Sequence, residues 1–253
     1  MDNPIISYLR KPPSLKGIKR ALFIQPHPDD DQIGAGGMMA YLVDKGAEVY
    51  ELTVTDDRYL EPDKEEGNTT RQKEALAAQK YLGVKNAGFL GFYDKTRATV
   101  DELSIKILEV IRRIRPDAVF TPDPNLATEC HSDHIKVGTA VKYAVLDCMC
   151  DFYPSLKEDG SRRDDAFTVS VLAFYYTDKP NRKADITKYL DKKIESVRCH
   201  ASQVSSDLLM FIKELAKISA KGTKYKYCEG FRALSSLQMH CFNISADNDN
   251  EEE

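Results

Sequence analysis

Apolar strand-like runs alternate with helical segments along the first 145 residues, and this alternation limits the fold more than any other feature of the chain. The run ALFIQ at 21–25 is apolar and aromatic up to its last residue, which is typical of a strand buried on both faces. A helical segment at 33–45 follows and is closed by Gly46, and a second strand follows at 47–55. A strand, a helix and a strand in this order form a βαβ unit, whose two strands pair in parallel.

The alternation continues through the middle of the chain and becomes less regular toward its C-terminal end. It predicts an α/β fold with an open, mostly parallel, doubly wound sheet and helices on both faces. The further predicted elements are helices at 69–83, 100–114, 184–203 and 206–220, short strands near 88–90 and at 116–122, and one strand or a strand pair at 167–176.

Length and charge indicate one globular domain. The chain has 253 residues, and we expect a single domain over 1–246 followed by an acidic disordered tail at 247–253. A formal charge of -4 argues against nucleic acid as a partner. No run approaches the length of about 20 apolar residues that a membrane span needs, and the first residues lack the apolar segment of a signal peptide. These features predict a cytoplasmic protein without a membrane span.

Two clusters of histidine and aspartate carry the chemistry. Three of the five histidines lie in HPDDD at 27–31 and HSDH at 131–134, and each cluster follows a predicted buried strand. In open α/β sheets the crevice beyond the carboxyl ends of the strands binds ligands, so both clusters can face one crevice. An imidazole from HSDH, with one imidazole and one carboxylate from HPDDD, provides a His/His/Asp set that suits zinc with one position open to water. A neighbouring carboxylate can then act as a general base.

Other interpretations of these motifs are weaker. HPDD alone is typical of a solvated turn with an aspartate helix cap, and a lone H-x-x-H is common by chance. A dinucleotide site is disfavoured because carboxylates stand where a pyrophosphate needs backbone amides, and GAGGMM does not complete G-x-G-x-x-G. The occurrence of both clusters after buried strands, in a chain with few histidines, favours the metal site.

The two motifs resemble those of the PIG-L/LmbE family of zinc-dependent N-acetylglucosamine deacetylases. PHPDDDQIGAGG is similar to the first family motif, in which HPDD is followed by Glu and a glycine-rich helix start, and HSDHIKVG is similar to the second. Weaker matches are R-x-x-E at 71–74, HASQ at 200–203 and EGFR at 229–232. Asp31 departs from the family pattern because it replaces the usual Glu, which leaves its role open.

The resemblance implies a Rossmann-like fold and a site with defined roles. The metal ligands would be His27, Asp30 and His134, and Asp29 would be the general base that activates the bound water. Zinc is the expected metal, and the resemblance leaves open whether iron(II) replaces it.

Three more residues gain roles from the resemblance. His131 would be a protonated stabiliser of the oxyanion and the acid that protonates the leaving amine, and Asp133 would tune it. Arg71 would bind sugar hydroxyls. Chemically, amide hydrolysis needs such a base, charge stabilisation and a proton for the amine.

The implied function is hydrolysis of the N-acetyl group from an N-acetylglucosaminyl conjugate or oligosaccharide. The expected partner is therefore a small N-acetylated sugar. One alternative is a non-catalytic carbohydrate-binding or regulatory protein that retains the pocket, and another is a metal-dependent hydrolase of a different amide or ester. The sequence does not specify the aglycone, homo-oligomerisation, or the roles of Glu129 and His200.

Overall fold

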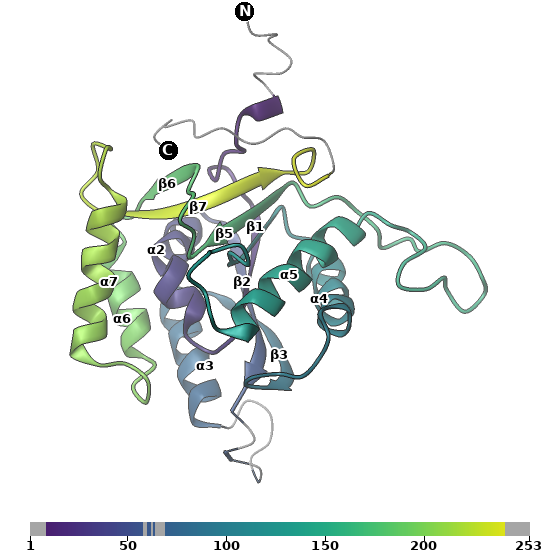
Figure 1. Ribbon diagram of the computed structural model, residues 1–253, viewed down its shortest axis with the longest axis horizontal. Coiled ribbons are helices and arrows are strands. Elements are labelled where there is room, and N and C mark those ends of the chain that lie inside the picture. Colours follow the sequence, from purple (N-terminus) through teal and green to yellow (C-terminus); the bar gives the residue numbers. More distant parts are fainter. Residues whose placement is uncertain (1–8, 58–59, 62, 64–68, 241–253) are drawn as a thin grey trace, which may run out of the picture.

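The computed structural model describes residues 9–57, 60–61, 63 and 69–240, and its centre is a seven-stranded sheet (Figure 1). The expected tail at 247–253 lies outside the described residues. The strands are β1 (Arg20–Gln25), β2 (Glu48–Asp56), β3 (Lys85–Tyr93), β4 (Ala118–Pro122), β5 (Val171–Tyr175), β6 (Arg182–Asp185) and β7 (Cys228–Ser235). The helices are α2 (Asp30–Asp44), α3 (Thr70–Leu82), α4 (Val100–Ile114), α5 (Ser132–Asp147), α6 (Leu190–Arg198) and α7 (Ser206–Ser219).

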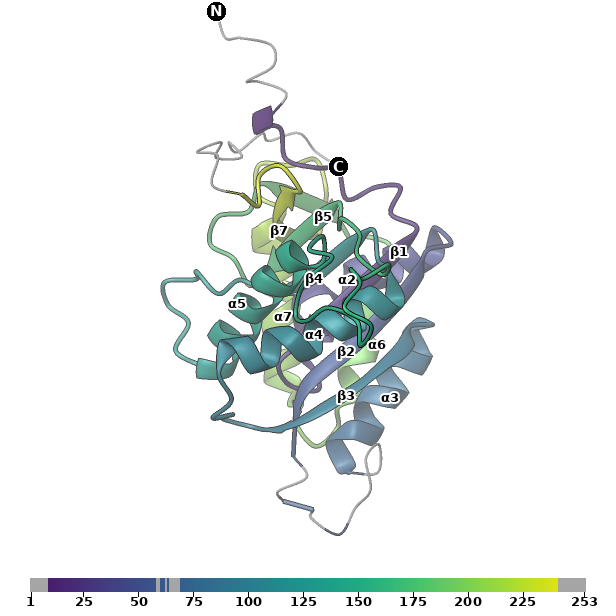
Figure 2. The same cartoon turned by 90° about the vertical axis from the view of Figure 1, so that its right-hand side faces the viewer.

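The sheet is parallel over most of its width, and the predicted fold class is confirmed. Its strand order is β3-β2-β1-β4-β5-β7-β6, with parallel pairing from β3 to β5 and antiparallel pairing of β7 with both β5 and β6. Helices α2, α3 and α6 cover one face, and α4 and α5 cover the other (Figures 1 and 2). The outermost helix, α7, packs on α6 and β7. No helix in the described ranges has both the length and the apolarity to cross a membrane.

The packing of the central strand β1 explains why its residues form a continuous apolar run instead of alternating with polar residues. Phe23 packs into the core beneath α2, whereas Leu22 and Ile24 pack beneath α4 and α5. The ring of Phe23 stacks on that of Phe120 in the neighbouring β4, with centroids 4.3 Å apart. A strand covered by helices on both faces has no solvent side, so both of its faces are apolar.

The glycine-rich start of α2 is required by close packing. A Cβ atom at Gly34 would lie 2.3 Å from the ring of Tyr175, and one at Gly37 would lie 2.6 Å from the side chain of Ile186. Side chains at these positions would push α2 away from the sheet, because packed interiors leave no room for an added methyl group. The glycines thus fix the helix whose first turn carries the acidic motif.

Three sequence predictions were inaccurate, all of them away from the central strands. The strand predicted near 88–90 runs from Lys85 to Tyr93 and lies at the sheet edge, where partial exposure removes the apolar run. The helix predicted at 184–203 is instead the end of β6, a connection, the shorter helix α6 and a turn, and neither β6 nor β7 was predicted. The strands β6 and β7 are short or interrupted by polar residues. Their strand pattern is therefore weaker than the helical periodicity of the residues that follow β6.

Candidate active site

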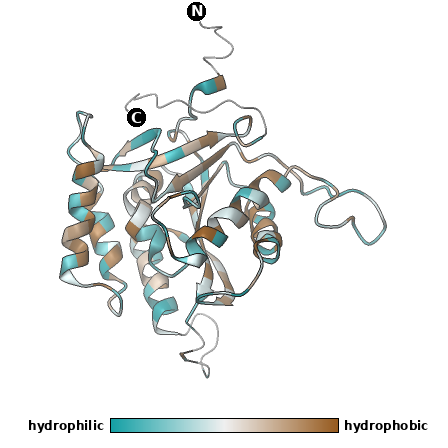
Figure 3. Cartoon of the chain, in the orientation of Figure 1, coloured by the Kyte–Doolittle hydropathy of each residue, from teal (hydrophilic) through white to brown (hydrophobic). Residues whose placement is uncertain are grey.

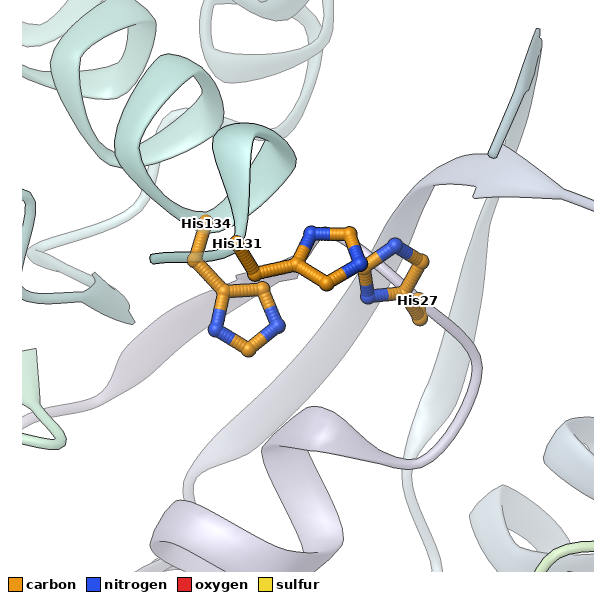
Figure 4. Close-up of side chains that lie close together, drawn as sticks. All are labelled: His27, His131 and His134. Atoms are coloured by element: carbon orange, nitrogen blue, oxygen red, sulfur yellow. The ribbon is translucent and has the colours of Figure 1, made fainter. Parts of the chain in front are cut away.

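Three histidines meet at the carboxyl ends of the parallel strands, as the sequence predicted. His27 lies on the connection after β1, and His131 and His134 lie at the start of α5 (Figure 4). The ring centroid of His27 lies 4.6 Å from that of His131 and 5.3 Å from that of His134, and the last two are 5.1 Å apart. The two motifs, distant in sequence, therefore face one crevice.

Asp30 lies between two of these imidazoles, with one carboxylate oxygen facing each. Its Oδ2 is 3.2 Å from Nδ1 of His27, and its Oδ1 is 3.3 Å from Nε2 of His134. Burial opposes ionisation of Asp30, but hydrogen bonds from His134 and His27 hold its pKa well below the usual range. Two imidazole nitrogens and one carboxylate are the ligand types of catalytic zinc sites, which use three protein ligands and keep a position open. The donor set fits such a metal.

The other ring nitrogen of His27 faces two further carboxylates. Nε2 lies 3.3 Å from Asp133 Oδ2 and 3.3 Å from Asp94 Oδ1. Burial lowers the basicity of His27, yet hydrogen bonds to Asp133 and Asp30 raise its pKa to about 10. Asp133 is held in turn by the backbone N–H of Lys95, which donates to Oδ2 at 2.7 Å. A carboxylate that accepts a hydrogen bond from the second ring nitrogen of a histidine fixes the orientation of the ring and makes the imidazole a more basic ligand.

Two groups of three side chains in the described part of the chain place one potential ligand atom each within 4.8 Å of one another. They are His27, His131 and His134, and His27, Asp94 and Asp133. His27 belongs to both groups, and Asp30 bridges it to His134. The crevice is therefore rich in ligand atoms, with His27 at its centre.

Asp29 is the N-cap residue of α2, yet its side chain does not cap the helix. Gln25 does so instead, because its Oε1 accepts the backbone N–H groups of Asp29 at 3.2 Å and Asp31 at 3.0 Å. The backbone of Asp29 has φ of 138°, a region that residues with a side chain rarely adopt and that is enriched at functional sites. Its Oδ2 lies 3.4 Å from Nη2 of Arg71. Burial and then the charge of Asp30 raise the pKa of Asp29 to about 7.

His131 is the N-cap residue of α5 and is held by the helix that it starts. Its Nδ1 accepts the backbone N–H of Asp133 at 3.3 Å, and its Nε2 lies 3.9 Å from Asp94 Oδ1. Burial and then the charges of His27 and His134 lower its pKa. Because Nδ1 already accepts a hydrogen bond, Nε2 is the ring atom that carries the proton of the neutral form.

Glu129 contacts two residues at the start of α5. Its Oε2 lies 2.8 Å from Nδ1 of His134, and its Oε1 accepts the backbone N–H of His131 at 2.6 Å. His134 thus has a carboxylate on each ring nitrogen, Asp30 on one and Glu129 on the other. Burial opposes protonation of His134, but these carboxylates raise its pKa.

Asp31 points away from the crevice into the protein. It is fully buried, and burial followed by the charge of Glu51 raises its pKa well above the usual range. The third aspartate of HPDDD therefore lies beneath the crevice, whereas its two neighbours face it. His200 is also fully buried, and burial lowers its pKa to about 4.

Sequence reasoning missed Asp94 and left Glu129 without a role. Asp94 directly follows β3, so it lies at the same sheet edge as the residues after β1 and β4. The sequence could have indicated Asp94, because a carboxylate directly after a parallel strand is a candidate for the crevice. The prediction missed it because β3 was predicted too short, which placed Asp94 in a loop. Glu129 lies in a loop without a recognisable pattern.

Comparison with known proteins places the chain in a family. Residues 22–145, which contain both motifs, match the model of the PIG-L family, described as GlcNAc-PI de-N-acetylase. A diacetylchitobiose deacetylase of Thermococcus kodakarensis is 33% identical over 236 residues, covering 88% of this chain and 86% of the relative. The chain belongs to the PIG-L family. The family expected from HPDDD and HSDH is thereby confirmed.

Other PIG-L relatives agree in sequence and in fold. The N,N'-diacetylchitobiose deacetylase from Pyrococcus horikoshii, solved with its inhibitor MPG, superposes with a TM-score of 0.79 at 30% identity, covering 94% of this chain and 91% of that chain. A probable N-acetyl-alpha-D-glucosaminyl L-malate deacetylase 2 of Bacillus cereus is 26% identical over 199 residues, covering 75% of this chain and 86% of the relative. The similarity therefore extends beyond the residues that match the family model and into the C-terminal part of this chain.

Proposed function

We propose that this PIG-L protein is a metal-dependent deacetylase that hydrolyses the N-acetyl group of an N-acetylglucosaminyl conjugate or oligosaccharide. Its relatives are named as deacetylases of diacetylchitobiose and of GlcNAc-malate. The observation that carries the proposal is the position of Asp30 between His27 and His134, with a separate carboxylate, Asp29, beside them. This arrangement separates metal binding from proton transfer.

The proposed ligands of the metal are His27, Asp30 and His134, and zinc is the proposed metal. When bound, the metal lowers the pKa of a water molecule to about 7 and polarises the acetyl carbonyl. Carboxylates on the second ring nitrogens of both histidines support this assignment, since such contacts fix the orientation of metal-binding imidazoles. Asp133 therefore acts as a positioning residue for His27, in addition to its backbone contact with His131.

Asp29 is the proposed general base. It accepts a proton from the attacking water, and a pKa of about 7 suits this task because a base works best near the operating pH. Its contact with Arg71 orients the carboxylate, and the guanidinium beside it is the proposed donor to sugar hydroxyls. Because Gln25 caps α2 in its place, the Asp29 carboxylate is available to the crevice.

His131 is the proposed acid. Its protonated ring stabilises the negative charge that develops on the acetyl oxygen, and its Nε2 proton passes to the nitrogen as the amide C–N bond breaks. The Nδ1 contact with the backbone N–H of Asp133 directs Nε2 into the crevice in the neutral ring, and the ring has to give up this contact when it is protonated, because both nitrogens then carry a proton. The products are acetate and the free amine of the sugar.

The alternative of a non-catalytic carbohydrate-binding protein is not favoured, because the named relatives are deacetylases, and the residues that we propose as acid, base and ligands are all present. The single domain, the cytoplasmic location, homo-oligomerisation and the absence of nucleic acid as a partner stay predictions.

Acetate release tests the proposal. Purified protein with zinc is expected to release acetate from N,N'-diacetylchitobiose or another N-acetylglucosaminyl compound. Asp29→Asn is expected to lower kcat by about 10² to 10⁴ while zinc content stays the same, since general bases contribute that much. The matched control is Asp44→Asn, at the exposed far end of the same helix. Full activity of Asp29→Asn would show that the assigned base is wrong.

A further inference from the structure

A large cleft extends from the active site to the outermost helix. It begins at His134 and Glu129, has a volume of about 720 Å³, and ends against α7, at the left edge of the molecule in Figure 1. Its lining is mixed, and the apolar part includes Ile33, Leu126, Pro180, Ile212, Leu215 and Ile218.

Some of the polar side chains of the cleft are engaged within the protein. Lys193 and Glu229 form an ion pair of 2.5 Å, with both side chains more than nine-tenths buried. The amine of Lys183 donates to a backbone carbonyl at 2.7 Å, and the hydroxyl of Thr177 donates to Asp123 at 2.6 Å. The ammonium of Lys183 has two further N–H groups, and Asp178 and Ser219 also line the cleft. Polar groups for a ligand therefore lie beside the apolar wall.

The α7 wall has apolar side chains that the fold itself does not bury. Ile212 and Ala216 pack inward, but Leu215 is 42% and Ile218 is 53% exposed, and both face the cleft. Figure 3 shows hydrophobic residues around α7, including its outer side. A cluster of exposed apolar side chains usually marks a binding surface. Here the surface is continuous with the active site.

We propose that the cleft along α7 binds an apolar aglycone, so that the preferred substrate is an N-acetylglucosaminyl glycoside of an aliphatic group. This inference rests on the proposed deacetylase function. A substrate whose acetyl carbonyl reaches His27 and His134 has to place the rest of its structure along an opening of the crevice. The opening toward α7 offers an aliphatic wall with exposed Leu215 and Ile218, against which a hydrocarbon chain would bury apolar surface.

Three substrates test the proposal: the methyl and octyl glycosides of N-acetylglucosamine, with the octyl compound below its micelle concentration, and N,N'-diacetylchitobiose. We expect kcat/KM for the octyl glycoside to exceed that for the methyl glycoside by at least about tenfold, because each buried methylene group adds to binding. We also expect it to exceed that for diacetylchitobiose. Equal values for the octyl and methyl glycosides, or a preference for diacetylchitobiose, would overturn the inference but leave the deacetylase function intact.

A pair of variants on α7 locates the effect. Leu215→Asp places a charge on the cleft wall and is expected to reduce the octyl-to-methyl ratio of kcat/KM toward one. The matched control is Met210→Asp, on the same helix, 64% exposed and outside the cleft lining, which should leave both values unchanged. Equal effects of the two substitutions would contradict the assignment of the cleft. Thermal unfolding of both variants checks that each is folded.

Binding separates this inference from the proposed function. In the Asp29→Asn variant with zinc, calorimetric titration should give a Kd for the octyl glycoside at least about tenfold lower than for the methyl glycoside. That result without turnover in the wild type would refute the deacetylase function and retain the apolar cleft. Equal binding of the two glycosides would refute the cleft whatever the activity.

Discussion

The parallel and antiparallel parts of the sheet contribute differently to the active site. The residues proposed to bind metal and move protons follow β1 and β4, and Asp94 follows β3, all in the parallel part. The antiparallel strands β6 and β7, with α6 and α7, supply none of these residues but form much of the cleft. The cleft proposed for the aglycone therefore lies in a different part of the sheet from the proposed reaction residues. Changes in the first part should affect turnover, and changes in the second should affect stability or substrate choice.

Loss of a proposed ligand in the parallel part should have the largest effect. His134→Ala removes one of three ligands, so we expect bound zinc to fall far below one per chain and acetate release to fall by at least about 10³-fold, since metal activation of water lowers its pKa by several units. Metal analysis and acetate release measure both. Chelation of the wild type, followed by readdition of zinc, should abolish and then restore activity.

Substitution of Glu129 tests the same proposed metal site with a smaller expected effect. Glu129→Gln keeps the size of the side chain that contacts Nδ1 of His134 but removes its charge, and zinc affinity should fall by about 10- to 100-fold, as for other carboxylates that support a metal ligand. Unchanged zinc affinity in Glu129→Gln would limit this residue to holding the α5 loop. Normal zinc content in His134→Ala would place the metal elsewhere in the crevice.

In the antiparallel part, Glu229 should be important for stability. Its carboxylate accepts the backbone N–H groups of Gly37 at 2.9 Å and Met38 at 2.7 Å within α2, and it pairs with Lys193. Glu229→Gln leaves the buried amine of Lys193 without its charge partner, which should lower the free energy of unfolding by about 3 to 5 kcal/mol. Urea unfolding measures this loss.

The control for Glu229 is an exposed ion pair on the same side of the molecule. Glu195 contacts Arg198 at 3.1 Å with both side chains more than half exposed. Glu195→Gln should cost at most about 1 kcal/mol. Similar losses in the two variants would mean that the buried pair does not hold α2 to the antiparallel part.

The sequence predicted the parallel part well and the antiparallel part poorly, for a physical reason. Strands such as β1 and β4, covered on both faces, need continuous apolar residues, and such runs are visible without a structure. The two motifs could be placed at one crevice because parallel strands end at one edge. By contrast, β7 and the cleft along α7 depend on contacts between distant segments. The same is true of the pairing of Asp133 with His27, since one-dimensional spacing does not show which side chain a carboxylate faces.

Two buried glutamates sharpen the comparison further. In the antiparallel part Glu229 has a lysine partner, whereas in the parallel part Glu51 on β2 accepts hydrogen bonds from three amide side chains and, among the described residues, from no cation. These donors are Gln25, Gln32 and Gln79. Neutral donors only partly offset the loss of hydration, so burial raises the pKa of Glu51 from 4.5 to about 7.

The raised pKa of Glu51 predicts a smaller, pH-dependent effect. The folded protein binds this proton more tightly than the unfolded chain does, so the stabilisation is complete below about pH 4.5 and is lost as pH rises through about 7. Glu51→Gln has no proton to lose at this position, and an amide rotation of Gln32 would let its oxygen accept from the new side chain. Between pH 4.5 and 8 the free energy of unfolding of the wild type should therefore fall relative to Glu51→Gln by up to about 3 kcal/mol.

Urea unfolding across this range measures the difference, with exposed Glu109→Gln as the control that should follow the wild type. Parallel curves for wild type and Glu51→Gln would mean that Glu51 stays ionised when buried, and the two glutamates would then not differ in the way their partners suggest.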